Sequence, residues 1–250
     1  MQASTGLVLR CRPLAELAPH VFTTASVRLR EDADEWRRVA AALDVESPSL
    51  RLIHQVHGRD VAVVRAGDPP PVDRPEADII INSAAGTAVG VRTADCAPIL
   101  LADRSGAIVG AAHAGWRGTM QDVAGTAVRA LRETFGVRPS DIVAAVGPCL
   151  GPCCGEMGEE VVEAFRAAGH GDADIDRWFR RPRQDQGGRP HFDLWRANAD
   201  QLARAGVPAD SIYVARVCTK CRPDVFHSYR AAGAAVGRMV GAIRSAVAAN

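Results

Sequence analysis

Hydrophobic residues along this chain follow two different spacings, which predict strands and helices in turn. Short runs rich in aliphatic and β-branched residues predict six strands, over residues 61–65, 78–81, 98–102, 107–112, 142–146 and 211–217. From Gly118 to Phe135 the apolar residues recur instead at steps of three and four, which predicts an amphipathic helix that Gly136 ends. The same spacing predicts helices around residues 161–165, 194–205 and 236–247. The pattern therefore indicates a mixed protein whose helices coat its sheets.

The segment from Gly169 to Pro190 follows neither spacing. It is rich in Gly, Asp and Arg and poor in aliphatic residues, which predicts a long surface excursion rather than a linker between two cores. The chain has no internal repeat, and 250 residues with 47% hydrophobic content can bury one large core. We therefore expect a single domain over residues 1–250.

Charge and cysteine usage narrow the class of partner. Lys and Arg number 30 against 29 Asp and Glu, and neither sign forms a block that would grip nucleic acid or a membrane surface. The chain starts with no unbroken apolar stretch, and no later segment approaches the length of a membrane span. Seven cysteines, an odd number in a chain too large to need cross-links, favour reduced thiols or metal ligands. These features predict a cytoplasmic protein that acts on a small molecule.

Unusual residues gather in four short clusters at junctions between predicted strands and loops, where functional sites are usually built: LIHQVHGRDV, TADCAPILLAD, AAHAGWRGT and GPCLGPCCGE. His57 lies in a turn before one strand, Cys96 precedes a second, and His113 ends a third. Two imidazoles and a thiolate suit zinc, and three protein ligands leave the open position typical of a catalytic site. On spacing alone the three are as well explained as unrelated residues, because no closely spaced pair joins them.

These motifs resemble the laccase-domain family, which includes the peptidoglycan editing factor and bacterial purine nucleoside phosphorylases formerly described as polyphenol oxidases. The likeness is carried by QVHG, ADC, HAGWRG and GPCLGPCC, and continues in order through FDLWRAN, VCTKC and HSYR to a C-terminal GR. The resemblance implies that His57, Cys96 and His113 bind a metal ion, zinc or alternatively copper. It also implies an α+β fold in one domain, with mixed β-sheets between helices in four layers, α/β/β/α.

Three residues near these ligands are candidates for catalysis. Arg117 follows Trp116 where a helix begins, so its guanidinium and free backbone N–H groups would seat a phosphate; the alternative is a surface arginine over a packed tryptophan. Asp95 would orient a ligand or move a proton beside the metal, or else cap a turn. The thiolate of Cys96 would shape the electrostatics as a ligand.

The other cysteines admit two interpretations. A four-thiolate structural zinc site would draw on Cys149, Cys153, Cys154, Cys218 and Cys221. Only Cys218 and Cys221 form a conventionally spaced pair, so we favour a loop that lines the pocket with small groups. Gly155 stands where the family often has Tyr, and a stacking partner for a base is then missing.

The chain departs from the family after Val21–Thr24. There the family usually continues with an Arg-containing stretch rich in Gly and Ser that ends in Ser-Leu-Asn, whereas this chain reads ASVRLREDADEWRRV. Arg28 and Arg30 are the candidates to replace the family's arginine. Substrate identity is therefore less constrained than the metal site.

The resemblance implies a zinc-dependent purine nucleoside phosphorylase acting on adenosine, inosine and methylthioadenosine, with adenosine deaminase as a side activity. Its substrates would be a nucleoside and phosphate. The family equally implies a metal-dependent amidase that edits serine-containing cell-wall precursors. A cysteine-nucleophile hydrolase built on Cys96, a copper-loaded phenol oxidase and a non-catalytic binding module stay open. A multicopper cluster is excluded, because it needs repeated His-x-His pairs and this sequence contains none.

Overall fold

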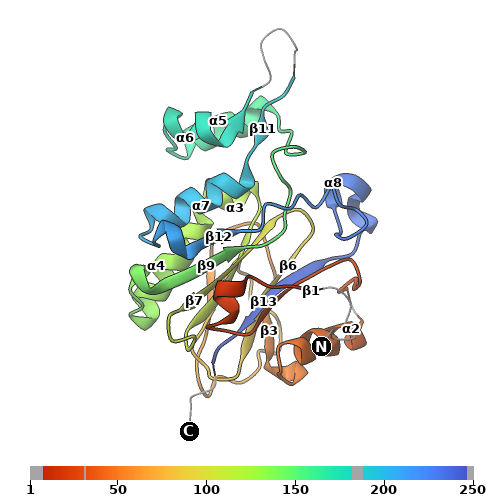
Figure 1. The fold of residues 1–250 in the computed structure, drawn as a ribbon, viewed down its shortest axis with the longest axis vertical. Coiled ribbons are helices and arrows are strands. Elements are labelled where there is room, and N and C mark those ends of the chain that lie inside the picture. Colours follow the sequence, from red (N-terminus) through yellow and green to blue (C-terminus); the bar gives the residue numbers. More distant parts are fainter. Residues whose placement is uncertain (1–7, 31, 182–187, 247–250) are drawn as a thin grey trace.

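Two mixed β-sheets stacked face to face form the centre of the molecule (Figure 1). The computed structural model describes residues 8–30, 32–181 and 188–246. The larger sheet has the order β12 (Ile212–Val214), β9 (Ile142–Val146), β7 (Ala97–Asp103), β8 (Val109–Ala114), β5 (Ile79–Asn82) and β4 (Val61–Val64). The smaller has the order β1 (Val8–Leu9), β2 (His20–Thr23), β13 (Met239–Arg244), β6 (Ala88–Thr93) and β3 (Leu50–Leu52). A separate hairpin pairs β10 (Phe179–Arg180) with β11 (His191–Phe192).

Helices cover the outer face of each sheet. The helices are α1 (Arg12–Ala15), α2 (Ala33–Ala42), α3 (Trp116–Met120), α4 (Val123–Phe135), α5 (Glu159–Ala167), α6 (Asp172–Trp178), α7 (Leu194–Arg204) and α8 (Tyr229–Ala232). In Figure 1, α4 and α7 flank the larger sheet, α2 lies on the opposite side of the stack, and α5 and α6 lie above α7. No helix in the described ranges is long and apolar enough to cross a membrane.

Alternation along the strands divides the core into three layers of side chains. In β7, Ile99 and Leu101 face the cluster under α4 and α7, whereas Leu100 points between the two sheets. On the smaller sheet, Val240 and Ala242 point outward to a third cluster beneath α2. Because a strand's side chains alternate between faces, two stacked sheets need both faces covered, and this produces four layers. The predicted α/β/β/α arrangement is confirmed.

The six predicted strands all occur, although their ends shift by up to three residues. The strand over residues 142–146 is confirmed to the residue as β9, and the one predicted over 107–112 begins two residues later as β8. The predicted helix over 118–135 is two helices, because Asp122 takes a left-handed conformation (φ 60°) between α3 and α4. Gly136 ends α4 in the left-handed conformation (φ 72°), as expected.

The helix predicted around residues 236–247 is wrong. Its described part forms β13, a central strand that pairs with β2 on one side and β6 on the other, and Val247 lies outside the described residues. A strand buried on both faces reads as a continuous apolar run, which spacing alone does not separate from a buried helix. Gly241 allows β13 to pack closely on the facing sheet, because a Cβ there would lie 2.6 Å from Pro98.

The surface excursion predicted from Gly169 to Pro190 is also wrong in part. Residues 172–178 form α6, and its Ile175 and Trp178 are fully buried beneath α7 and β10. Ile175 and Trp178 are three residues apart, and most of their neighbours in this short helix are charged. Spacing therefore does not show the apolar face of α6. Residues 182–187 of the segment lie outside the described part of the chain.

Candidate metal centre

The fold brings His57, Cys96 and His113 to one point at the edge of the sheet stack. His57 lies in the loop between β3 and β4, Cys96 in the short turn that carries the chain from β6 to β7, and His113 on β8 opposite Pro98. One ligand atom from each lies within 4.8 Å of the other two. The two imidazole rings meet edge to face with centroids 4.9 Å apart. The predicted set therefore converges, although its members lie on separate elements.

Backbone geometry at this point is constrained by close packing. His57 and Asp95 have positive φ values of 62° and 88°, which cost a non-glycine residue about 1 kcal/mol or more and persist where surrounding contacts enforce them. Gly115 lies against two of the ligands: a Cβ there would be 2.9 Å from Cys96 Sγ and 3.3 Å from His57 Cδ2. The glycine that precedes α3 is thus needed for the ligands to meet.

A fully buried carboxylate, Asp78, organises two of the three ligands. Its Oδ1 lies 2.7 Å from His113 Nδ1, and its two oxygens accept the backbone N–H groups of Val56, His57 and Gly58 at 3.1, 3.1 and 2.6 Å. An ionised carboxylate only accepts, so His113 carries its proton on Nδ1 and directs Nε2 away from Asp78. Burial raises the pKa of Asp78, but the hydrogen bonds from His113, Gly58 and Val56 outweigh it and lower the pKa below its ordinary value.

The sequence offers Asp95 as a residue that orients a ligand, moves a proton beside the metal or caps a turn, and in the structure both of its carboxylate oxygens accept hydrogen bonds from the C-terminal part of the chain. Asp95 Oδ1 accepts the Thr219 hydroxyl at 2.6 Å, and Oδ2 accepts the backbone N–H of Arg230 at 2.6 Å. Asp95 thereby ties the turn that holds Cys96 to the C-terminal part of the chain. Asp78 was overlooked because it lies 35 residues from His113 and reads as the first residue of an apolar strand; a lone carboxylate ahead of a buried strand was the available signal.

The pKa values of Cys96 and His113 favour a thiolate beside an imidazolium when no metal is bound, and a metal would take the place of the second proton on His113. Burial would raise the pKa of the Cys96 thiol, but the charge and hydrogen bond of His113 and the contact with His57 lower it to about 6. Burial would lower the pKa of His113, but Cys96 and Asp78 raise it to about 9. At neutral pH the sulfur is therefore a ready nucleophile or metal ligand.

The donor set fits one zinc ion. A thiolate and two imidazoles are borderline-soft ligands, and three protein ligands that all line the adjoining cavity would leave one position of a zinc ion open. Asp78 supplies the carboxylate partner that metal-binding histidines generally have. A multicopper cluster does not fit, because four of the seven histidines, all of which are described, hydrogen-bond to backbone carbonyl oxygens outside the ligand trio. These are His20, His170, His191 and His227.

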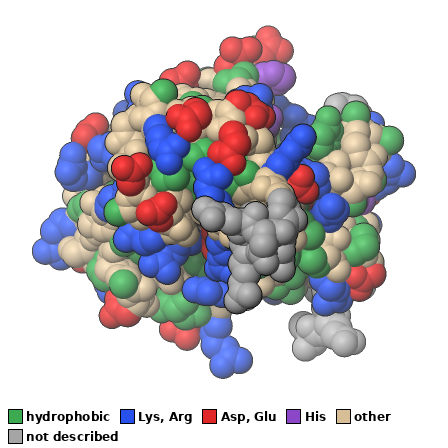
Figure 2. Space-filling view, turned by 90° about the horizontal axis from the view of Figure 1, so that it is seen from above, with side chains coloured by type: hydrophobic (Ala, Val, Ile, Leu, Met, Phe, Trp, Pro, Cys, Tyr) green, Lys and Arg blue, Asp and Glu red, His purple; other side chains and the backbone are tan. Residues whose placement is uncertain are grey.

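A cavity of about 890 Å³ opens over the ligand trio. Arginines reach it from several elements: Arg30, Arg117, Arg230 and Arg238. In the part of the chain that the structure describes, no ion pair joins these four to a carboxylate. On the outer face seen in Figure 2, by contrast, acidic and basic side chains are interspersed. The cavity therefore concentrates positive charge beside the metal site.

Two of the arginines singled out from the sequence lie at the cavity. Arg117 lines the cavity and stacks on Trp116, with its guanidinium carbon 4.3 Å from the ring centroid. The α3 helix that begins beside it has only five residues, so its N-terminus adds little to the guanidinium charge. Of the two N-terminal candidates, Arg30 lines the cavity, where its side chain donates to the carbonyl oxygens of Ala234 and Val236.

The loop over residues 147–158 forms one wall of the cavity, as predicted. Leu150 and Gly155 line it, and a Cβ at Gly155 would collide with the carbonyl oxygen of Phe192. Gly155 and Phe192 also share a backbone hydrogen bond of 2.8 Å. The close approach of these two backbone segments explains why glycine stands here.

Comparison with known proteins gives the site a family context. A family described as multi-copper polyphenol oxidoreductase laccase matches residues 30–246. A purine nucleoside phosphorylase of Deinococcus radiodurans is 36% identical, covering 93% of this chain and 90% of that protein. One from Bacteroides thetaiotaomicron is 36% identical over 66% of this chain, which spans only 60% of that relative's length. A prokaryotic protein named adenosine deaminase RL5 is 38% identical over 80% of this chain and 76% of its own length.

Solved structures agree with the observed fold. The crystal structure of YlmD from Geobacillus stearothermophilus is similar with a TM-score of 0.82 at 29% identity, covering 98% of both chains. YfiH from Bacillus licheniformis is similar with a TM-score of 0.86 at 24% identity, again covering 98% of both chains. The sheet stack described above is therefore shared with these proteins.

Proposed function

Because the chain belongs to the family described as multi-copper polyphenol oxidoreductase laccase, in which similar relatives are named purine nucleoside phosphorylase and adenosine deaminase, we propose that it is a zinc-dependent purine nucleoside phosphorylase. Its substrates would be adenosine, inosine and methylthioadenosine, each with phosphate. The catalytic unit would be a single domain over residues 1–250. The observation that carries the proposal is the cavity of about 890 Å³ that joins the ligand trio to a group of arginines.

His57, Cys96 and His113 would hold the zinc ion. When bound, it would supply a Lewis acid next to the substrate. Asp78 keeps the His113 proton on Nδ1, and the short bonds around Asp78 hold the His57 loop in place without reorganisation during turnover. The protein's own contribution is thus a fixed set of donors.

Phosphate binding falls to the arginines. Arg117 is braced on Trp116, and a braced guanidinium loses less entropy when it binds an oxyanion. Arg30 faces the same cavity, so a dianionic phosphate would meet positive charge from two sides. Phosphorolysis breaks the bond between the base and the ribose anomeric carbon, and these arginines would hold phosphate for attack on that carbon. Asp95, at the cavity wall, would assist proton movement to the departing base.

The decisive test is phosphate-dependent base release by the purified, metal-quantified protein. Adenosine, inosine and methylthioadenosine are incubated with and without phosphate, and free base, ribose 1-phosphate and deaminated nucleoside are separated by chromatography. Release that requires phosphate and stops on chelation supports the proposal. Cys96→Ser should be inactive, whereas Cys11→Ser should be as active as the parent because Cys11 lies outside the ligand trio. Zinc-loaded protein that releases no base from any of the three would refute it.

Adenosine deamination is a second candidate, favoured by the relative named adenosine deaminase RL5. It uses water rather than phosphate and yields inosine, so the same chromatogram separates the two activities. Loss of the guanidinium in Arg117→Ala should reduce phosphorolysis and leave deamination unchanged within about twofold, because only phosphorolysis uses an oxyanion.

A further inference from the structure

A group of four cysteine sulfur atoms lies on the loop and the turn next to the cavity wall, outside the ligand trio. The Sγ atoms of Cys153, Cys154, Cys218 and Cys221 all lie within 4.8 Å of one another. Cys221 Sγ is 3.4 Å from Cys153 Sγ and 3.5 Å from Cys154 Sγ. Cys149, from the same loop, is instead buried in the hydrophobic core. Four of the five loop and turn cysteines thus meet, although their two segments are more than 60 residues apart in sequence.

Backbone hydrogen bonds build this arrangement. The loop over residues 147–158 and the turn over 217–221 form a parallel bridge, with Cys149 N–H donating to Val217 O at 3.3 Å and Thr219 N–H donating to Cys149 O at 3.1 Å. The N–H groups of Gly151 and Cys221 donate to the Cys218 sulfur. Such donors orient a sulfur ligand and stabilise its thiolate. The sulfur cluster is therefore held from two backbone segments and is more than a chance approach of flexible side chains.

The spacing of the sulfurs matches a metal site. With Zn–S bonds of about 2.3 Å and a tetrahedral angle, neighbouring sulfurs lie roughly 3.8 Å apart. The separations of 3.4 and 3.5 Å and the 4.8 Å limit for the group bracket that value. All seven cysteines are free thiols. We propose that Cys153, Cys154, Cys218 and Cys221 bind a second zinc ion, distinct from the ion held by the ligand trio.

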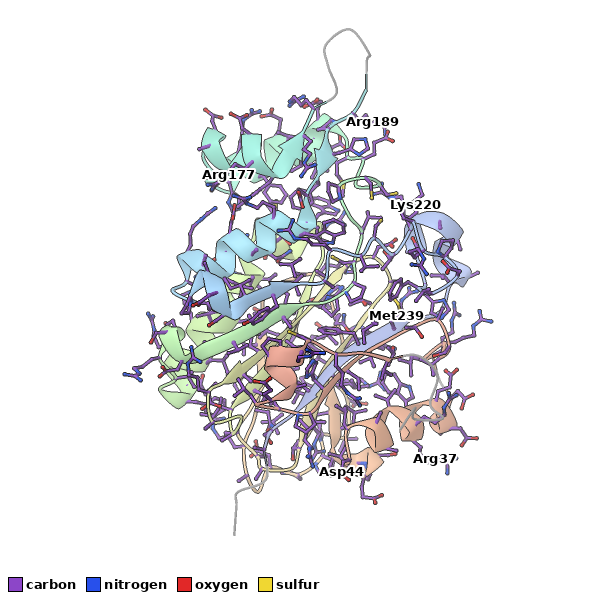
Figure 3. All side chains as sticks on the ribbon, in the orientation of Figure 1. Arg37, Asp44, Arg177, Arg189, Lys220 and Met239 are labelled. Atoms are coloured by element: carbon purple, nitrogen blue, oxygen red, sulfur yellow. The ribbon has the colours of Figure 1, made fainter. Side chains whose placement is uncertain are left out.

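The role of this ion is structural. Four protein ligands leave no open position for water or substrate, whereas the ligand trio leaves one. A zinc ion with four thiolates carries a net charge of −2, and Lys220 stands between two of the ligands, near α8 in Figure 3. Sequence spacing disfavours the site because Cys153 and Cys154 are adjacent, whereas a conventional pair has two residues between its cysteines, as Cys218 and Cys221 do.

The second ion would fix one wall of the cavity. Leu150 and Gly155, on the loop that carries two of the ligands, line the cavity. Thr219, inside the other ligand pair, donates to Asp95, the neighbour of the catalytic ligand Cys96. Cross-linking the loop to the turn therefore holds both the pocket wall and the turn that presents Cys96.

Zinc counting tests the proposal without reference to nucleoside turnover, so its failure is distinguishable from that of the proposed function. The full chain is purified under reducing conditions without chelator, and zinc is measured by mass spectrometry of the metal. We expect about two zinc ions per chain, about one in Cys153→Ser/Cys221→Ser, about one in Cys96→Ser and about two in Cys11→Ser. Cys153 and Cys221 are exposed, so their replacement by serine leaves the core unchanged.

Alkylation of the unmodified chain gives an independent measurement that needs no folded variant. Under native conditions the exposed thiols of Cys153 and Cys221 should resist alkylation until a strong chelator is added, and peptide mass spectrometry identifies the sites. Protection that a chelator removes supports the second ion. A single zinc ion in the parent protein with immediate alkylation of Cys153 and Cys221, or a disulfide within the group in freshly reduced protein, would overturn it.

Discussion

Replacing Asp78 by asparagine removes the one carboxylate that contacts both histidine-bearing segments of the metal centre. The carboxylate accepts four hydrogen bonds, three from backbone N–H groups and one from His113 Nδ1. Asparagine has the same shape but offers a single acceptor oxygen and turns an NH₂ group towards the other donors. His113 then loses the partner that selects its tautomer and holds its ring.

The magnitude follows from what is lost. At least one of the four donors is left buried without an acceptor and the imidazole loses a charged partner, so Asp78→Asn should destabilise the fold by about 3–5 kcal/mol. Loss of a carboxylate behind a histidine ligand weakens metal binding by about 10- to 100-fold, or about 1.4–2.7 kcal/mol. Both effects should appear in one variant, since the same carboxylate serves the backbone and the imidazole.

Two assays separate these effects. Zinc affinity is measured by competition with a calibrated chelator at fixed pH, and stability by denaturant unfolding of the metal-free protein. Asp193→Asn is the matched control: Asp193 is also a buried carboxylate, but it accepts from the Arg196 N–H at the start of α7 and from the Arg180 side chain, and not from the ligand histidines. The control should lose stability and keep its zinc affinity. Zinc affinity within twofold of the parent in Asp78→Asn would refute the role given to this carboxylate.

The free energy of unfolding at acidic pH gives a second test of Asp78. The folded pKa of Asp78 lies below its ordinary value of 3.8, so its contribution is present above that pH and is lost as the pH falls through the folded pKa. The metal-free parent should therefore lose stability more steeply below about pH 4 than Asp78→Asn does, because only the parent must protonate this carboxylate. Parallel acid limbs would contradict the assigned pKa direction.

Three further substitutions address other parts of the site. Gly115→Ala places a methyl group 2.9 Å from Cys96 Sγ, so zinc content after dialysis should fall while α3 and the far-ultraviolet dichroism persist; full retention of zinc would argue against this tight packing. Arg117→Ala should raise the KM for phosphate by about 10- to 100-fold and change the KM for nucleoside by less than about twofold, a pattern that initial-rate kinetics would show or exclude. Gly155→Ala should lower the melting temperature through its clash with Phe192, as a thermal scan would measure, and an unchanged value would contradict the described wall.

The strands that sequence spacing predicted best are those of the larger sheet. β7 and β9 are continuous aliphatic runs bounded by charged or glycine residues, so their length and composition identify them. Most of the smaller sheet was missed, because β1 and β3 are too short to show a period and the apolar run of β13 is not separated by spacing from a buried helix. Its strands are defined by pairing between residues up to 223 apart, which no local window contains.

The candidate site divides in the same way. His57, Cys96 and His113 could be predicted because each lies in a distinctive motif, whereas their convergence depends on the stacking of the sheets. Asp78 has no distinctive neighbours in the sequence, and the GR motif that contains Arg238 does not indicate its role, so only the fold places these residues beside the ligands or the cavity. Sequence spacing disfavours the four-thiolate group because no motif contains all four cysteines. A β-bridge between two distant segments brings their sulfur atoms together.

The metal ligands and the cavity arginines are held by different parts of the fold, and this difference bears on substrate specificity. The metal ligands are held by the sheet stack itself: Cys96 lies in the turn that joins one sheet to the other, and His113 lies on a central strand. Three of the cavity arginines come from peripheral segments, Arg30 from the N-terminal stretch, Arg230 from α8 and Arg238 from the segment before β13, whereas Arg117 lies in α3 next to the ligands. Peripheral segments tolerate change better than packed sheets. Substitutions at Arg30 should therefore alter which anion or nucleoside is accepted while zinc affinity stays unchanged, and a loss of zinc in Arg30→Ala would show that the two halves are coupled.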